Sequence, residues 1–146
     1  MITRRDMVVA LAACAASPAA VALADQPQAM GSRIFDWNAT PSVPNETGSV
    51  KSFCKARTAT LNELEMHATT LEPGKASHPP HKHPNEELII LKQGTLEAYV
   101  NGEWKRVETG SIIFAASNQL HGVRNVGSEP AIYHVINWRS PLTPEA

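Results

Sequence analysis

The sequence has few of the residues on which several common kinds of protein depend. The chain of 146 residues has two cysteines, Cys14 and Cys54, and only 18% of its residues are charged. Its 13 basic and 14 acidic side chains nearly cancel, so the formal net charge is −1. Nucleic acids and anionic membrane surfaces are bound through concentrated lysine and arginine. We therefore expect neither of them as a partner.

The residues needed for two common kinds of site, a catalytic triad and a nucleotide-binding loop, are also scarce. After position 24, aspartate occurs only at Asp25 and Asp36, so a Ser-His-Asp triad has little material. No glycine-rich phosphate loop follows any expected strand, which leaves nucleotide binding unsupported. The length and the 42% apolar share are those of one ordinary domain with a single buried core.

The first 24 residues have the pattern of an export signal. A charged start, residues 1–7, precedes a run of small apolar residues, 8–24, that ends in Ala22-Leu23-Ala24. This order predicts cleavage after Ala24 and a periplasmic or secreted protein, whose only cysteine is then Cys54. The run contains Pro18 and is short for a membrane span, so we expect no stable membrane insertion.

Two export routes fit this segment. Thr3-Arg4-Arg5-x-Met7 resembles a twin-arginine signal, a receptor-read address known for carrying folded cargo with its cofactor in place. Leu11-Ala12-Ala13-Cys14 is similar to a lipoprotein cleavage box, but the apolar stretch before Cys14 is short. We therefore prefer the twin-arginine route, and a diacylglyceryl group on Cys14 in a mass spectrum would overturn that choice.

The chain after residue 57 is organised as short strands separated by turns. Asn101-Gly102 is a strong hairpin signal because both residues tolerate positive φ. The spacing of the turns predicts an all-β sandwich or barrel over residues 58–141, with strands at 64–71, 87–91, 95–100, 104–107, 111–114, 121–126 and 131–138. Residues 25–57 are predicted to form an extended N-terminal arm with one or two short strands, anchored by Phe35 and Trp37.

Histidines are concentrated in one segment, His78-Pro79-Pro80-His81-Lys82-His83, and Glu87 follows at the start of an apolar strand. Side chains two residues apart in a strand project from the same face, so both His81 and His83 can point inward. Imidazole and carboxylate are ligands of divalent first-row metals. The alternative interpretation is a solvated histidine run kept soluble by its prolines. A further histidine, His121, opens a strand that only a folded sheet brings close.

These residues resemble the two motifs of the cupin superfamily, in its single-domain form. The first motif is similar to Gly74 followed by His81-x-His83-x-x-x-Glu87-x-x-x-x-x-x-Gly94, and the second to Gly110, Ala116, Asn118, His121 and Asn125. The family has proline where this chain has Ala116 and glycine where it has Asn118, and one extra residue separates Gly74 from His81. Asparagine is the commonest non-glycine residue at positive φ, so the change at position 118 is mild.

The resemblance implies a fold and a ligand set. The implied fold is a double-stranded β-helix, or jelly-roll barrel, and the implied ligands of one divalent metal ion are His81, His83, Glu87 and His121. Zinc, nickel and copper are possible, and the affinity series favours copper and zinc if the site fills outside the cell. Loading in the cytoplasm before twin-arginine export would avoid that competition, so we favour iron or manganese.

Several functions stay open at this point. Positions left free on the metal favour an enzyme, most simply with oxygenase-like chemistry on a small chelating or anionic substrate. A metal-dependent isomerase, decarboxylase or lyase is an alternative, as is a binding module for a sugar or another small ligand that turns nothing over.

The remaining sequence predictions concern two further histidines and the oligomeric state. His78 lies in a proline-flanked loop, where solvation is expected more than a place at the rim of the site. His134 shares a strand face with Ile132, Ile136 and Trp138, which predicts an inward position, as a hydrogen-bonded core histidine or a proton shuttle. We also expect a homodimer in which Phe35 and Trp37 pack near the partner.

Overall fold

The computed structural model describes residues 28–145, and every regular element in that part of the chain is a β-strand. The predicted export signal and its predicted cleavage site lie outside the described residues. The nine strands are β1 (Val43–Asn45), β2 (Gly48–Ala56), β3 (Glu63–Leu71), β4 (Glu86–Gln93), β5 (Thr95–Val100), β6 (Glu103–Glu108), β7 (Ile112–Ala115), β8 (Gly122–Asn125) and β9 (Ala131–Arg139). Residues 28–145 contain no helix with the length and hydropathy of a membrane span.

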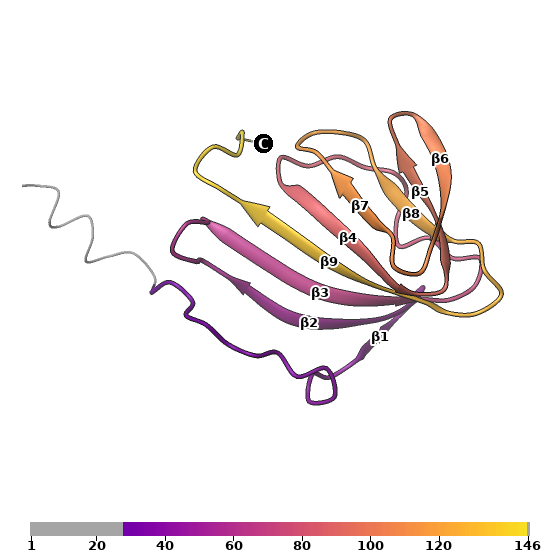
Figure 1. Ribbon diagram of the computed structural model, residues 1–146, viewed down its shortest axis with the longest axis horizontal. Coiled ribbons are helices and arrows are strands. Elements are labelled where there is room, and N and C mark those ends of the chain that lie inside the picture. Colours follow the sequence, from indigo (N-terminus) through magenta and orange to yellow (C-terminus); the bar gives the residue numbers. More distant parts are fainter. Residues whose placement is uncertain (1–27, 146) are drawn as a thin grey trace, which may run out of the picture.

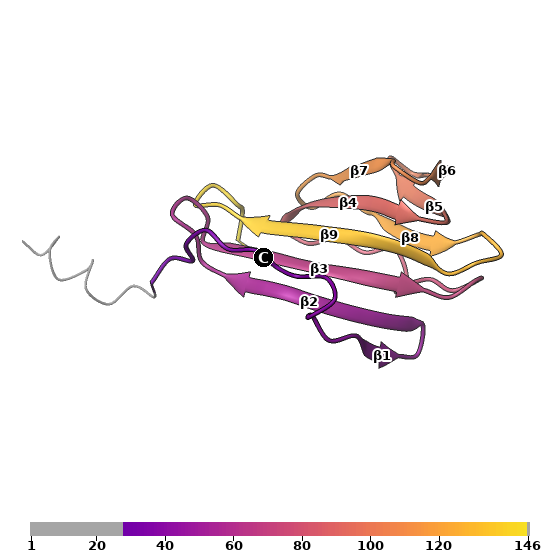
Figure 2. The same ribbon diagram turned by 60° about the horizontal axis from the view of Figure 1, so that its bottom comes forward.

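The strands form two antiparallel sheets that face each other. The larger sheet has the order β1-β2-β3-β9-β4-β7, and the smaller has the order β6-β5-β8. Figure 1 and Figure 2 show the smaller sheet lying over the β4 and β7 end of the larger one. This all-β arrangement is a jelly-roll barrel, as the sequence predicted.

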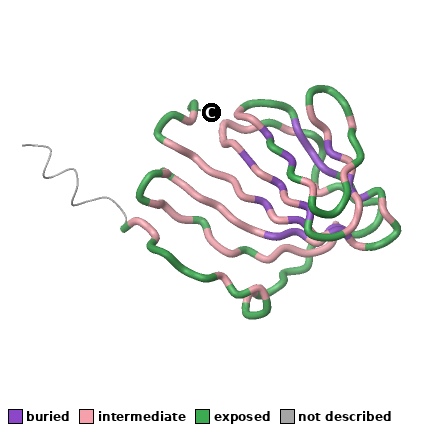
Figure 3. The backbone as a smooth tube through the Cα atoms, in the orientation of Figure 1, coloured by how far each residue is buried: buried purple, intermediate pink, exposed green. Residues whose placement is uncertain are grey.

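The core lies between the sheets because alternate residues of each strand point inward. In β4 the buried apolar residues are Ile89 and Leu91, and in β5 they are Leu96 and Ala98. Leu91 and Leu96 are almost fully buried, at 1% and 0% exposure. In Figure 3 the buried segments gather where the two sheets face each other, while the outer loops are exposed. The seven strands expected after residue 57 are confirmed with end shifts of only a few residues.

Three turns have the backbone that their residues predict. Asn101 and Gly102 both have positive φ, 54° and 84°, and connect β5 to β6 as a tight hairpin. Asn118 has φ 58°, a positive φ of the kind that asparagine tolerates best among non-glycine residues. Gly94 has φ 92°, and a Cβ added there would lie 2.9 Å from the Cα of Ala131.

The segment expected as an N-terminal arm contains two strands, one of them long. β2 pairs with β3 over most of its length, so it is part of the larger sheet. Its register shifts between Ser52 and Cys54, and the intervening Phe53 contacts Trp37, with ring centroids 6.3 Å apart. The Nζ atom of Lys51 donates to the carbonyls of Trp37 and Thr40. The segment before β1 is thereby fixed to the outer face of the sheet.

Candidate metal centre

Two segments far apart in the sequence are joined by main-chain hydrogen bonds at the candidate site. The amide of His81 donates to the carbonyl of His121 at 2.9 Å, and the amide of His121 donates back to the carbonyl of His81 at 2.9 Å. A second pair of bonds joins Gly74 and Lys75 to Asn125. The loop before β4 therefore runs beside β8 and is joined to its region by isolated bridges, which places the two sequence motifs next to each other.

Three histidines converge at this junction. One ring nitrogen of each of His81, His83 and His121 lies within 4.8 Å of the corresponding nitrogens of the other two. The ring centroids of His81 and His121 are 4.6 Å apart, and those of His83 and His121 are 4.8 Å apart. His121 is buried, at 4% exposure, while His81 and His83 are half-buried. The predicted clustering of these three residues is confirmed.

The hydrogen bonds of the rings leave nitrogen lone pairs directed into the cluster. The Nδ1 atom of His83 lies 3.0 Å from the carbonyl oxygen of Asn85, and the Nδ1 atom of His121 lies 2.8 Å from that of Gln119. A carbonyl can only accept, so we assign the proton to Nδ1 in both rings and the lone pair to Nε2. Among residues 28–145, the His121 Nε2 atom and the His81 Nδ1 atom are buried without a partner. Buried, unpaired nitrogens fit a metal ion.

Glu87 lies beside this cluster and contacts two of its members. Its carboxylate oxygens are 3.6 Å from the His83 Nε2 atom and 3.7 Å from the His121 Nε2 atom. The Nδ2 atom of Asn137 donates to Glu87 at 3.3 Å, and the side chain of Asn85 donates to the amide oxygen of Asn137. Glu87, at 8% exposure, thus lies against two of the three histidines and is the candidate fourth ligand.

The electrostatics of the cluster favour a neutral His81 imidazole. Burial is the largest cause, and together with charge repulsion from the neighbouring His78, His121 and His83 it lowers the pKa of His81 to about 4. A metal ligand must present a lone pair rather than a proton. His81 is therefore in the form that binds a metal at neutral pH.

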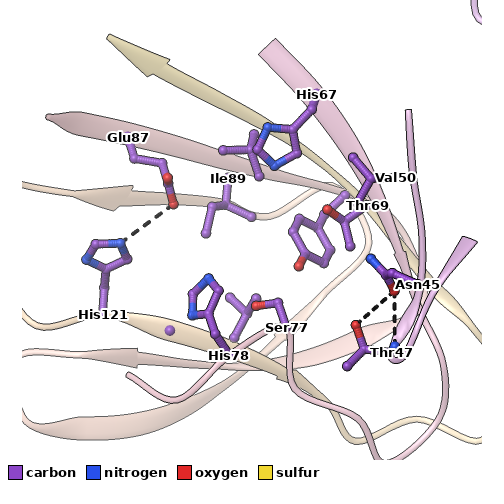
Figure 4. A pocket seen from close by; sticks show the side chains of 14 residues that line it. Asn45, Thr47, Val50, His67, Thr69, Ser77, His78, Glu87, Ile89 and His121 are labelled. Atoms are coloured by element: carbon purple, nitrogen blue, oxygen red, sulfur yellow. Dashed lines mark hydrogen bonds and ion pairs between the residues drawn. The ribbon is translucent and has the colours of Figure 1, made fainter. Parts of the chain in front are cut away.

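A cavity of about 230 Å³ opens beside the cluster. Figure 4 shows Glu87 and His121 at one end, and at the other Asn45, the last residue of β1, and Thr47, from the turn that follows. The polar residues of its middle are Thr69, Tyr133, Ser77 and His67, and its apolar walls come from Val50, Ile89, Val123 and Val135. A substrate-sized space therefore adjoins the candidate metal ligands.

Sequence reasoning missed the residues that shape this cavity. His67 and Tyr133 lie on the inward faces of β3 and β9, and Asn137 follows on the same face of β9. Burial lowers the pKa of His67 and raises the pKa of Tyr133, so both groups are neutral at pH 7. The alternation of side chains in β9 was the signal that groups these residues, because it places Tyr133, Val135 and Asn137 on one face of the strand.

The inward position predicted for His134 is wrong. His134 points to the outer face of the larger sheet, where its ring centroid lies 5.6 Å from that of Trp37 and 6.0 Å from that of Phe53. The N-terminal segment covers that face, so an apolar environment is available outside the barrel as well as inside. His78 is exposed as expected, yet it also lines the cavity, with its ring centroid 4.1 Å from that of His81.

Known protein families with a similar sequence agree with this geometry. The sequence model described as "Cupin domain" matches residues 67–137, the segment that contains all four candidate ligands. The domain is a cupin. A curated relative, the tetracenomycin polyketide synthase protein TcmJ of Streptomyces glaucescens, is 37% identical over 75 residues, which cover 51% of this chain and 48% of that protein. The chain thus matches about half the length of this relative.

Solved structures share the fold of this cupin at low sequence identity. KdgF from Halomonas sp. superposes with a TM-score of 0.61 at 18% identity, over 76% of this chain and 97% of that one. An RmlC-like cupin from Shewanella frigidimarina gives 0.60 at 16% identity, over 76% and 95%. The Cnp3 cupin domain of Schizosaccharomyces pombe gives 0.62 at 14%, over 73% and 74%. At these identities the likeness concerns the fold alone.

Proposed function

We propose that this cupin is a metal-dependent enzyme with oxygenase-like chemistry on a small chelating or anionic substrate. The convergence of three imidazoles and Glu87 at one end of a cavity carries the proposal. Such donors suit a divalent first-row ion, with iron or manganese expected and zinc, nickel or copper as alternatives. A bound ion of this kind supplies Lewis-acid polarisation of a substrate oxygen and, when redox-active, the means to activate dioxygen.

The residues of the chain have separate tasks in this proposal. His81, His83, Glu87 and His121 hold the ion, and three neutral histidines with one carboxylate give a divalent site a net charge of +1, which attracts an anionic substrate oxygen. Ile89 and its apolar neighbours exclude water from the cavity wall. The hydroxyl groups that line the cavity orient the substrate.

A metal-dependent isomerase or lyase is the second candidate, and His67 favours it. His67 lines the cavity, and burial lowers its pKa, so its ring is available to accept a proton at pH 7. Its Nδ1 atom lies 3.7 Å from a carboxylate oxygen of Glu65, which orients the ring. Proton transfer by a positioned neutral histidine is the step that isomerisation or elimination next to a carbonyl requires.

The metal content of the purified protein tests the core of the proposal. His83→Ala should abolish stoichiometric metal, because it removes a donor from the centre of the cluster. His134→Ala is the matched control and should retain the metal, since His134 lies on the outer face of the sheet. Unchanged metal content in His83→Ala would refute the metal centre.

Turnover separates the enzyme from a binding module. Oxygen uptake by metal-loaded protein should be measured with enediols, flavonols, β-diketones and 3-hydroxy acids, and product analysis of the same mixtures detects isomerisation or cleavage. Oxygen consumption supports the oxygenase, and product without oxygen consumption supports the isomerase or lyase. Affinity for a panel member without any product would instead support the binding module.

We also propose a homodimer that uses the exposed edge of the larger sheet. β7 is an edge strand, and its Ile112 and Phe114 side chains are 65% and 50% exposed. They lie beside Ile90 and Leu88 of β4 on the outer face. An apolar edge favours pairing with a second copy. Light scattering should give a dimer mass that Phe114→Ser lowers, and a monomer mass for the unmodified protein would contradict this proposal.

Export through the twin-arginine route is proposed on the sequence alone. Mass spectrometry of the protein recovered from its native host should find Asp25 as the first residue. Metal analysis of the same material identifies the ion that the protein carries after export.

A further inference from the structure

The cavity beside the metal centre offers hydrogen bonds in its middle, between the histidine cluster and the residues of the β1–β2 hairpin (Figure 4). Val50, Thr69 and Tyr133 are neighbours in register across β2, β3 and β9, and all three line the cavity. Thr69 and Tyr133 are only 5% and 2% exposed. The Tyr133 hydroxyl interacts with the hydroxyls of Ser77 and Thr69. Three hydroxyl groups are thus gathered at one place on the cavity wall.

These hydroxyls carry no charge. Burial raises the pKa of the Tyr133 phenol, which stays protonated at neutral pH. Serine, threonine and protonated tyrosine both donate and accept hydrogen bonds. They therefore match the hydroxyl groups of a substrate, which also donate and accept hydrogen bonds, and its carbonyl groups, which accept them.

The cavity also lacks a lysine or arginine. Among residues 28–145, none of the side chains that line it belongs to either type, and Glu87, at the histidine end, is its only carboxylate. A carboxylate moved from water into such a place without a cation carries a large desolvation cost. The only place in this cavity for an anionic group is at the histidine cluster, next to the proposed metal.

The size of the cavity limits the ligand. Its 230 Å³ is the space of about eight water molecules at about 30 Å³ each. Compounds with a short carbon chain fit within it.

We propose that this cavity selects a small hydroxy acid with a single carboxylate, held with the carboxylate toward His81, His83 and His121 and the hydroxyls toward Thr69 and Tyr133. Dicarboxylates of the same size are rejected, because their second carboxylate would lie among neutral hydroxyls with no cation. This inference rests on the proposed metal centre, which receives the first carboxylate.

Calorimetry on the manganese- or zinc-loaded protein tests the selection with glycerate and malonate. Both have three carbons, but glycerate has one carboxylate and two hydroxyls whereas malonate has two carboxylates. Glycerate should bind at least about tenfold more tightly, because its hydroxyls are matched by Thr69 and Tyr133. Malonate either gathers both carboxylates at the proposed metal and leaves these hydroxyls without a partner, or places one carboxylate among them with no cation. Free metal ions prefer malonate, so this preference would have to come from the protein. Equal or tighter binding of malonate, or binding of neither compound, would overturn the inference.

Two variants locate the selection in the cavity. Tyr133→Phe should weaken glycerate binding roughly three- to tenfold by loss of one hydrogen bond, with the metal content unchanged. The matched control is Tyr99→Phe, since Tyr99 packs against Trp104 in the smaller sheet and does not line the cavity. Thr47→Arg adds a cation at the end of the cavity opposite Glu87 and His121, and it should increase malonate affinity. Unchanged glycerate affinity in Tyr133→Phe would place recognition elsewhere.

Failure of the inference is distinguishable from failure of the proposed function. A protein that takes up no metal refutes the metal centre itself. A protein that takes up metal through His83 but prefers malonate keeps the metal centre and refutes only the selection by the cavity.

Discussion

Replacing Asn137 by alanine should weaken metal binding while the barrel stays folded. Asn137 lies opposite Glu87 in the β4–β9 register, and its Nδ2 atom donates to the Glu87 carboxylate at 3.3 Å. Its amide oxygen accepts from Asn85, whose own carbonyl lies 3.0 Å from the Nδ1 atom of His83. One amide therefore orients two of the four candidate ligands, and its loss leaves both free to turn.

The magnitude follows from the kind of contact that is lost. Removing a hydrogen-bond partner that orients a metal ligand costs roughly 10- to 100-fold in metal affinity. In the metal-free protein, the lost bond to a buried carboxylate costs about 1.5–3 kcal/mol of unfolding free energy. The nearby imidazoles of His83 and His121 offset part of that cost, so we expect the lower end of the range.

The assay compares two asparagine variants by chelator competition and by urea unfolding. Asn125 is the matched control because it is 1% exposed and makes three hydrogen bonds, donating to the carbonyls of Leu71 and Glu129 and accepting from the amide of Gly127. Asn125→Ala should lower stability more than Asn137→Ala does, yet change metal affinity less. Metal affinity that is unchanged in Asn137→Ala, or that follows stability alone in both variants, would refute the reasoning.

Three further predictions concern the fold. Burial lowers the pKa of His134 below the ordinary value of 6.5, so the native state binds fewer protons than the unfolded chain, and stability falls as the pH drops below about 6.5. His134→Gln should flatten this decline in urea unfolding with chelator present, and an unchanged slope would contradict it. Gly94→Ala should cost about 1–3 kcal/mol through strain and collision with Ala131, more than Gly102→Ala, which has open space; equal melting temperatures would refute this. Leu96→Ala should cost about 3 kcal/mol, since Leu96 is fully buried, and a loss under 1 kcal/mol in urea unfolding would show that the core collapses around the gap.

The strands of the barrel were predictable because their signals are local. In β4 and β5, alternation of buried and exposed residues follows from the period of two, and Asn101-Gly102 specifies the hairpin that follows. The three clustered histidines were predictable for a different reason. Their spacing resembles a known family, which supplied the long-range contact between His83 and His121 that no local pattern contains.

The faces of β9 could not be read from hydrophobicity. Ile132, His134 and Ile136 form one face, and Tyr133 and Val135 form the other, so both are apolar enough for a core. A strand with two apolar faces does not specify which one is inward. The outer face is sheltered by Trp37, a tertiary contact outside the local pattern. The same ambiguity concealed the cavity residues Tyr133 and His67.

The paired main-chain bonds between His81 and His121 bear on how the ion is chosen. Peptide groups, rather than the cation, tie the two donor-bearing segments together, so the cradle is assembled as soon as the chain has folded. Which metal ion binds then depends on which ions are available to the folded protein. The identity of a metal ion bound in this cradle is set by the mixture of ions around the newly folded barrel, and on the proposed export route the timing of transport relative to folding would decide which mixture that is.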